Sequence, residues 1–223
     1  MRRLVCSGLC ALIPVLVAAQ PAATTAAASW SVQPSPNVST FNNFLAGVAA
    51  TSASNAWAVG TYFSTGTGQT LIQHWNGQAW AIQPSPNVSG ADGLAGVAAT
   101  SASSAWAVGS SQNGTAPART LIEHWNGQAW AIQPSPNASS LGNSLTHVAA
   151  TSAANAWAVG YFFQGNGIQA LIEHWNGQRW AIQPSPNPGI VNQLYGVAAT
   201  AAANAWAVGS YRGLARTLIL NYR

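Results

Sequence analysis

The feature that most constrains this chain is an internal repeat that returns every 49 to 51 residues. A motif Ala-Trp-Ala-Val-Gly recurs with this spacing, centred on Trp57, Trp106, Trp157 and Trp206. A second tryptophan recurs every 50 residues, at Trp30, Trp80, Trp130 and Trp180. A period of this size indicates a solenoid, a propeller or another repeat array, and it takes precedence over local patterns.

Each unit divides into four short strand candidates, which in the first unit are Leu45 to Thr51, Ala56 to Phe63, Thr70 to Trp75 and Ala79 to Gln83. Asn76-Gly77 predicts a tight hairpin between the last two strands, because both central residues of a type I′ turn need positive φ. Pro84 and Pro86 end the fourth strand. Because prolines are tolerated only at a sheet edge, this strand is expected to be the outermost one. Four antiparallel strands with a proline-terminated outer strand are typical of a propeller blade.

The two ends of the array are offset by one strand. The segment from Trp30 to Asn37 matches a fourth strand with no preceding three, whereas Thr217 to Tyr222 matches a third strand without a fourth. The sequence therefore predicts an all-β fold, a β-propeller of four four-stranded blades whose last blade is closed by the N-terminal strand, which removes a raw sheet edge. A larger ring made by self-association and a solenoid or sandwich remain alternatives.

The units resemble secreted bacterial propeller repeats of the kelch-like or galactose-oxidase-like kind. Three features carry the resemblance: Val59-Gly60 at the end of a second strand, His74-Trp75 in the third, and Trp80 after it. Kelch repeats carry a paired glycine after the second strand, but this chain has a single one, at Gly60, Gly109, Gly160 and Gly209. Propellers of this kind include both enzymes and binding modules, so the resemblance implies the fold and leaves the function open.

Composition limits the partners and the compartment. Arg2, Arg3 and the apolar run to Ala19 have the pattern of a signal peptide (residues 1–19), followed by a disordered Ala/Thr-rich leader (residues 20–29) and the propeller (residues 30–223). We therefore expect a secreted, extracellular protein with no membrane span in the mature chain. Both cysteines lie in the signal segment, charged residues are only 4% of the chain and no lysine is present. Without a basic cluster, nucleic-acid binding is not expected.

The residues that bear chemistry do not form a catalytic group. Glu123 and Glu173 fall on separate units and Asp92 in a loop, whereas glycosidases generally need a pair of carboxylates at one bond. Equivalent histidines on different blades (His74, His124 and His174) would be too far apart to share a metal, so a structural hydrogen bond is the better interpretation. The strand tryptophans are expected to pack between blades rather than stack on sugars. We expect no enzyme activity, no metal and no cofactor.

The loops give the functional hypothesis, because their variation is confined to two classes. The links between second and third strands differ between units, as do the segments that lead into each first strand, and both classes fall at the same end of the blades. Function tends to reside on variable loops held by a constant scaffold. The predicted function is non-catalytic recognition of a glycan or an extracellular protein by a monomer. The candidate ligand-binding residues are Tyr62, Phe63, Asn113, Arg119, His147, Phe162, Phe163, Tyr211 and Arg212.

Two alternatives to this function remain: a secreted carbohydrate-active hydrolase or lyase that uses the channel mouth, and a purely structural surface module. His147 bears on the first, because it occupies the innermost strand where the other units have Gly47, Gly96 and Gly196, and it could face a central channel. Four Asn-x-Ser/Thr sequons, at Asn37, Asn87, Asn113 and Asn137, match the glycosylation pattern.

Overall fold

The computed structural model describes residues 28–88, 90–212 and 216–223. The signal peptide and most of the leader predicted from the sequence lie outside these residues. Every regular element in the described residues is a β-strand. No helix long and apolar enough to cross a membrane occurs in this part of the chain. Residues 28–33 belong to a unit separate from the body formed by residues 34–223, and the contacts and packing described below are those of that body.

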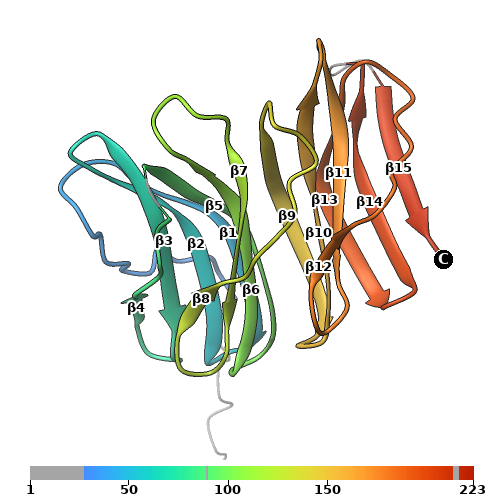
Figure 1. The fold of residues 1–223 in the computed structure, drawn as a ribbon. Coiled ribbons are helices and arrows are strands. Elements are labelled where there is room, and N and C mark those ends of the chain that lie inside the picture. The colour runs from blue at the N-terminus through green and yellow to red at the C-terminus, as the bar shows by residue number, and fades with distance from the viewer. Residues whose placement is uncertain (1–27, 89, 213–215) are drawn as a thin grey trace, which may run out of the picture. The chain divides into compact units, whose positions relative to one another are not determined.

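The strands form four antiparallel sheets, each a simple meander in which consecutive strands are neighbours (Figure 1). Blade 1 contains β1 (Asn43–Ser52), β2 (Asn55–Ser64), β3 (Thr67–Trp75) and β4 (Trp80–Gln83). Blade 2 contains β5 (Ala91–Ser101), β6 (Ser104–Gln112), β7 (Arg119–Trp125) and β8 (Trp130–Ile132). Blade 3 contains β9 (Asn143–Ser152), β10 (Asn155–Gln164), β11 (Gly167–Trp175) and β12 (Trp180–Ile182). Blade 4 contains β13 (Asn192–Ala201), β14 (Asn204–Tyr211) and β15 (Arg216–Tyr222).

The predicted all-β fold and the four-strand meander are therefore confirmed, and each outer strand ends before its first proline, as at Gln83. The hairpin between β3 and β4 also forms, with a different turn. Gly77 alone has positive φ, at 94°, so the turn is not type I′. The side chain of Asn76 orders a four-residue loop instead, because its Oδ1 accepts hydrogen bonds from the backbone N–H groups of Gln78 and Ala79 at 2.9 and 3.0 Å.

The glycine that ends each repeated Trp-Ala-Val-Gly stretch is required by the pairing of the first two strands. A Cβ at Gly109 would overlap the carbonyl oxygen of Gly93 on the neighbouring strand, and the other three blades have the same arrangement. The first two strands also change register beside this glycine, as between Leu94 and Gly96, which brings the backbones unusually close.

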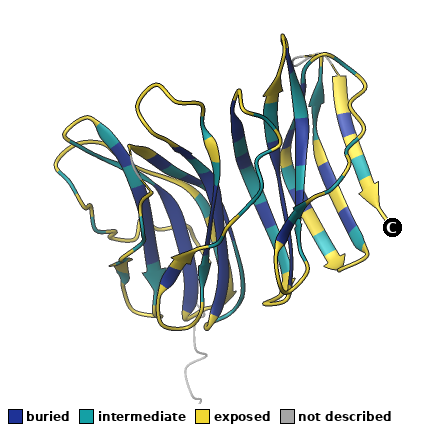
Figure 2. Ribbon diagram, in the orientation of Figure 1, coloured by how far each residue is buried: buried dark blue, intermediate teal, exposed yellow. Residues whose placement is uncertain are grey.

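Three apolar clusters hold consecutive blades together. In the first, Trp57, Val59 and Ile72 of blade 1 pack on a group from blade 2, namely Leu94, Val97, Ala105, Ala107, Leu121 and Trp130. The equivalent residues join blade 2 to blade 3 and blade 3 to blade 4. We call the side of a blade that carries the Trp57-type residues its forward face, and the side that carries the Leu94-type residues its rear face. Figure 2 shows buried residues concentrated on the strands, with exposed residues on the loops and along the outermost strand β15.

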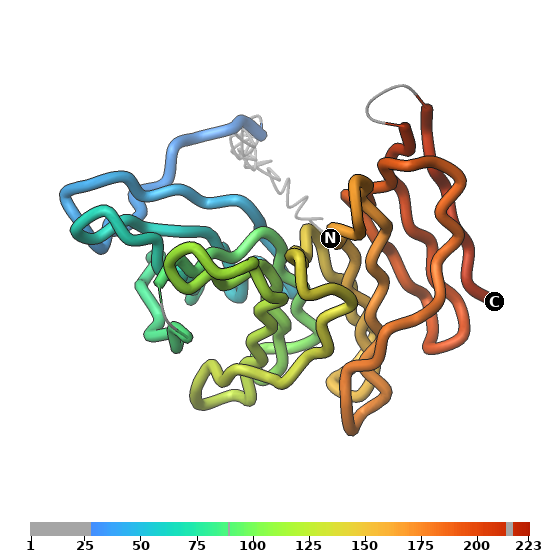
Figure 3. The backbone as a smooth tube through the Cα atoms, turned by 45° about the horizontal axis from the view of Figure 1, so that its top comes forward, coloured from blue at the N-terminus to red at the C-terminus, as the bar shows by residue number. Residues whose placement is uncertain are grey.

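The predicted closed ring is not confirmed. Blade 4 consists of three strands, and no strand is formed by residues 30–36. The inner strands of consecutive blades contact one another in the order β1, β5, β9 and β13, as the backbone trace shows (Figure 3), while no apolar cluster of the described residues joins blade 4 to blade 1. Two blade faces therefore stay open: the rear face of blade 1 and the forward face of blade 4.

Candidate functional site

The two classes of variable loop meet at one end of each blade, as the sequence predicts. In blade 1, the Phe63 N–H donates to the Asn42 carbonyl at 2.9 Å, which ties the second strand to the segment leading into the first. In blade 3, Phe163 N–H donates to the Gly142 carbonyl at 2.9 Å in the same way. We call this end of the molecule the loop rim.

The loop rim continues from blade to blade. Asn143 N–H, at the start of blade 3, donates to the Ala118 carbonyl of blade 2 at 2.9 Å. Ile168 N–H of blade 3 donates to the Ile190 carbonyl, in the loop leading into blade 4, at 2.9 Å. Because backbone hydrogen bonds link neighbouring loops, the rim is an ordered surface rather than a set of independent loops.

One polar residue orders the loop that leads into each blade. The Oδ1 atoms of Asn43, Asn143 and Asn192 accept from the N–H of Val38, Ser139 and Gly189 at 3.0 Å each. Blade 2 has a carboxylate at this position, and Asp92 Oδ2 accepts from the Val88 N–H at 2.6 Å. Asp92 is buried, so it serves the loop and is not presented to a ligand.

The predicted residues of blade 1 lie at the rim but are partly engaged. The Tyr62 hydroxyl donates to Gln69 Oε1, and the ring is half-buried. Phe63 packs edge-to-face against Phe44, with the ring centroids 6.3 Å apart and the planes at 87°. Phe44 is 56% exposed and Phe41 is 62% exposed. Sequence reasoning missed these two rings, although both lie in the variable segment that leads into the first strand.

The predicted aromatic residues of blades 3 and 4 divide into exposed and buried rings. Phe163 is 42% exposed and packs edge-to-face against Tyr161, at 5.9 Å and 83°. Phe162 packs instead against the apolar cluster between blades 2 and 3, and Tyr211 against the cluster between blades 3 and 4. Their rings contribute mainly to packing, so Phe163 is the ring of this group most available to a ligand.

The predicted polar residues also lie at the rim. Asn113 and Arg119 are exposed at the two ends of the loop between β6 and β7. A shallow hollow at this place is lined by Ala116, Pro117, Ala118, Arg119, Ser139 and Ser140. Arg212 is exposed, has a positive φ of 57°, and donates its N–H to the Val191 carbonyl at 2.6 Å. The hollow beside Arg119 brings together loops of blades 2 and 3.

His147 lies on the inner strand, as predicted, but its ring joins two blades. Its Nδ1 accepts a hydrogen bond from the Val197 N–H of blade 4 at 3.3 Å. Burial lowers the pKa of His147, which keeps the ring neutral and its Nδ1 able to accept this hydrogen bond. The inner strands are closely packed here, because a Cβ at Gly96 would lie 3.0 Å from the His147 Cα. His147 therefore has a structural role in this contact.

The second-strand tryptophans of blades 1 to 3 and the histidines of the same blades are structural, as predicted, whereas Trp206 of blade 4 is 44% exposed. Trp57, Trp106 and Trp157 are at most 1% exposed. Each packs against the histidine of its own blade, with ring centroids 4.0 to 4.3 Å apart. Burial lowers the pKa of all three histidines. In blades 1 and 3, the Nε2 atom of His74 or His174 lies 2.7 Å from an asparagine Oδ1 and donates to it.

The acidic side chains do not form a catalytic pair. Glu123 and Glu173 are completely buried, and none of their carboxyl oxygens has a hydrogen-bond partner. Burial raises the pKa of each to about 8, and the charge of Asp92 adds to the effect on Glu123. No group of His, Cys, Asp and Glu in the described residues is arranged to hold a metal ion.

Two of the sequon asparagines are used inside the fold. Asn87 Oδ1 accepts from the Thr70 N–H at 2.9 Å, and Asn137 Oδ1 accepts from the Thr120 N–H at 3.0 Å. Asn187, which is not in a sequon, makes the same bond to the Ala170 N–H at 2.8 Å. The repeat of this asparagine is therefore explained by strand capping, without glycosylation.

Comparisons with known proteins give little beyond a general likeness. No family model and no curated protein matches the chain, so the resemblance to kelch-like repeats is not confirmed. A solved structure of YCF48 bound to D1 peptide is 14% identical with a TM-score of 0.39, and the match covers 76% of this chain and 61% of that one. A fucose lectin from Kordia zhangzhouensis, solved with methyl-fucoside, is 9% identical with a TM-score of 0.38, covering 63% of this chain and 99% of that one.

Proposed function

We propose that this chain is a secreted, non-catalytic binding module that recognises a glycan through the loop rim. The observation that carries the proposal is the set of exposed aromatic rings at the rim, Phe41, Phe44 and Phe163. Exposed apolar side chains that gather in a patch mark an interaction site, and flat rings suit the apolar faces of sugars. Trp57, Trp106 and Trp157 cannot serve this purpose because they are buried between blades.

The electrostatics favour a neutral ligand. Of 223 residues only 10 are charged, and no lysine is present. Asp92 and both glutamates are buried, so the described rim offers arginines, amides, hydroxyls and aromatic rings. Such a surface has hydrogen-bonding groups for sugar hydroxyls but no concentration of charge for a phosphate or an acidic polymer.

The same placement of acids supports binding without catalysis. General acid and base groups must reach the substrate within hydrogen-bond distance. Glu123 and Glu173 lie inside separate blades, and Asp92 is hydrogen-bonded to Val88. Hydrolysis at the rim would therefore need general acid and base groups other than these three carboxylates.

The proposal is tested by applying the chain from Gln20 onward to a glycan array and assaying each bound glycan for cleavage. We expect selective binding of neutral glycans and no turnover, in the parent and in the variants Asp92→Asn, Glu123→Gln and Glu173→Gln. Reproducible turnover that one of these substitutions abolishes would establish an enzyme. If no glycan binds, while an extracellular protein binds at the rim, the ligand class proposed here is wrong.

A further inference from the structure

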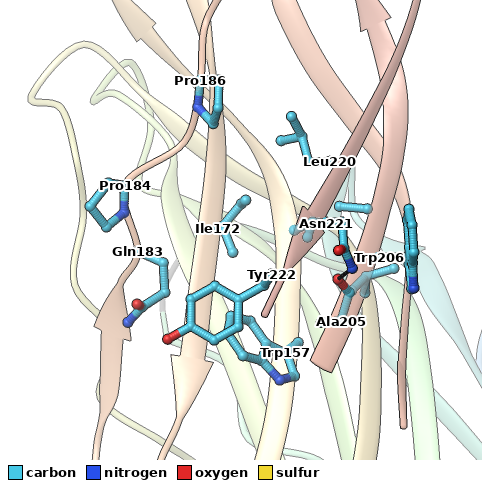
Figure 4. A pocket seen from close by; sticks show the side chains of 13 residues that line it. Trp157, Ile172, Gln183, Pro184, Pro186, Ala205, Trp206, Leu220, Asn221 and Tyr222 are labelled. Atoms are coloured by element: carbon cyan, nitrogen blue, oxygen red, sulfur yellow. Dashed lines mark hydrogen bonds between the residues drawn. The ribbon is translucent and has the colours of Figure 1, made fainter. Parts of the chain in front are cut away.

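An apolar hollow lies on blade 4, beside β15. It has a volume of about 430 Å³, including the part open to solvent, and its walls come from blades 3 and 4. Trp157, Ile172 and Tyr222 line it together with Gln183 and Pro184, and Figure 4 shows Tyr222 and Trp157 next to each other at one side.

The equivalent places between the other blades are filled by a tryptophan of the fourth strand. Trp130 of β8 packs edge-on against Trp57 of blade 1, with the centroids 5.1 Å apart. Trp180 of β12 packs in the same way against Trp106 of blade 2, at 5.2 Å. Blade 4 has no fourth strand in the described structure, so Trp157 has Tyr222 as a neighbour at 4.7 Å and no tryptophan from a fourth strand.

We propose that a second copy of this chain docks on blade 4, where its Trp30 strand adds to the edge of β15 and its Trp30 ring fills the hollow. The segment Trp30-Ser31-Val32-Gln33-Pro34-Ser35-Pro36-Asn37 matches the fourth strand of blade 1 and the linker after it, residues 80–87. By the register of β3 and β4, Trp30 pairs with Tyr222 and Val32 with Leu220. This inference is independent of the ligand proposed above.

Two open faces support the same contact. On the forward face of blade 4, Trp206, Val208 and Ile219 are 44%, 47% and 64% exposed, whereas their equivalents in blade 1 are completely buried. On the rear face of blade 1, Leu45 and Val48 are 48% and 70% exposed, whereas Leu94 and Val97 in blade 2 are 3% and 6% exposed. The two faces have the residues that pack together at each of the three existing interfaces.

The linker after the Trp30 strand shows which blade this strand can join. Gln73 Nε2 donates to the Pro36 carbonyl at 2.8 Å, so this linker lies on blade 1. Between blades, the same short linker joins a fourth strand to the blade immediately after it, and Pro84–Pro86 does so for blades 1 and 2. The Trp30 strand must therefore belong to a blade that adjoins the rear face of blade 1.

Blade 4 of the same chain does not pack there, since no apolar cluster of the described residues joins it to blade 1. Bringing it to that position would require the three filled interfaces to repack, because close-packed interiors do not deform continuously. A second copy makes the contact with all three interfaces unchanged. The contact is head-to-tail, and it closes into a ring or continues as a chain of copies.

The first experiment measures the mass of the chain from Gln20 onward by light scattering after gel filtration. We expect two or more chains per particle, and a shift to the monomer for Trp30→Ala, with the blade fold retained by circular dichroism. Phe41→Ala is the matched control, because it removes another exposed aromatic ring outside the proposed strand and should leave the mass unchanged. A monomeric parent overturns the proposal and favours the four-bladed ring predicted from the sequence.

The second experiment tests the register by disulfide formation. Gln133 N–H donates to the Ile122 carbonyl, which makes the next pair of the ladder, Glu123 with Ile132, a close pair without mutual hydrogen bonds. Val32 and Leu220 have this relation in the proposed contact, at a Cα separation of about 4.5 Å that suits a disulfide.

The variant Val32→Cys/Leu220→Cys should therefore oxidise to covalent species of two or more chains. The out-of-register control, Val32→Cys/Thr217→Cys, should cross-link far less. The chain from Gln20 onward has no cysteine of its own, so no other disulfide competes. Bridges within single chains, or monomers only, overturn the second-copy assignment; neither result bears on glycan binding.

Discussion

Replacing Glu173 by glutamine should abolish a large part of the pH dependence of folding. The Glu173 side chain is completely buried, and burial raises its pKa from 4.5 to about 8. Because the folded-state pKa exceeds the unfolded one, the protonated form favours folding. The contribution of Glu173 to the free energy of unfolding is fully present below pH 4.5 and is lost as the pH rises to about 8. A shift of this size corresponds to about 5 kcal/mol.

Blade 1 shows why glutamine should be tolerated. Gln73 occupies the equivalent position, is 1% exposed, and its Nε2 donates to the Pro36 carbonyl at 2.8 Å. A protonated glutamate offers an O–H where Gln73 offers an N–H, but an ionised glutamate cannot donate at all. Glu173→Gln should therefore leave the stability at pH 5 within about 1 kcal/mol of the parent and raise it at pH 9.

The assay is urea unfolding followed by tryptophan fluorescence at pH 5, 7 and 9. The difference in unfolding free energy between Glu173→Gln and the parent should grow with pH by several kcal/mol, approaching about 5 kcal/mol. Gln78→Glu, in the exposed hairpin of blade 1, is the control and should leave the pH dependence unchanged. Parallel pH profiles for Glu173→Gln and the parent would refute the assignment of a buried, neutral carboxyl.

Further substitutions test the packing of the blades and the loop that leads into blade 2 by the same urea assay. Trp57→Ala should lower the unfolding free energy by about 3–5 kcal/mol because the ring is fully buried between blades 1 and 2; a loss below about 1 kcal/mol would mean that the ring is exposed. Gly109→Ala should cost more than about 2 kcal/mol, because its Cβ would overlap the Gly93 carbonyl, whereas Gly114→Ala, with open space around it, should cost about 1 kcal/mol. Asp92→Asn should raise stability by about 1 kcal/mol, because Asp92 Oδ1 is buried without a hydrogen-bond partner. At the equivalent position of blade 3, Asn143 uses its Nδ2 to donate to the Ser139 carbonyl, and an asparagine at position 92 could do the same. An unchanged or lower urea midpoint would contradict this.

Much of the fold could be predicted from the sequence because the repeat supplies the same information four times. The strand pattern, the prolines that end the outer strands and the buried position of Trp57 recur with the same period, so the repeat predicts them even where one unit departs from the pattern. The type I′ turn predicted at Asn76-Gly77 was wrong. The Asn76 Oδ1 accepts hydrogen bonds from two backbone N–H groups and orders a four-residue loop, in which Asn76 does not take the positive φ that a type I′ turn needs.

The site and the closure were less predictable, for separate reasons. Whether an aromatic ring in a variable loop faces solvent depends on contacts between blades, and so Phe162 is packed while Phe163 is exposed. The repeat predicts where a strand is missing, but the number of blades in a ring depends on the angle between them, which no residue pattern specifies. His147 could be placed on the inner strand, but its bond to Val197 depends on that same blade-to-blade geometry.

The central claim, that the loop rim binds the ligand, is tested most directly by calorimetric titration of a glycan selected on the array. Phe163→Ala removes an exposed ring at the rim of blade 3, and Gln178→Ala truncates an exposed side chain in the hairpin at the opposite end of the same blade. We predict that Phe163→Ala or Phe44→Ala weakens binding about five-fold or more, as expected for a lost aromatic contact, while Gln178→Ala binds like the parent. Unchanged affinity in both rim variants, or a loss confined to Gln178→Ala, would contradict the claim.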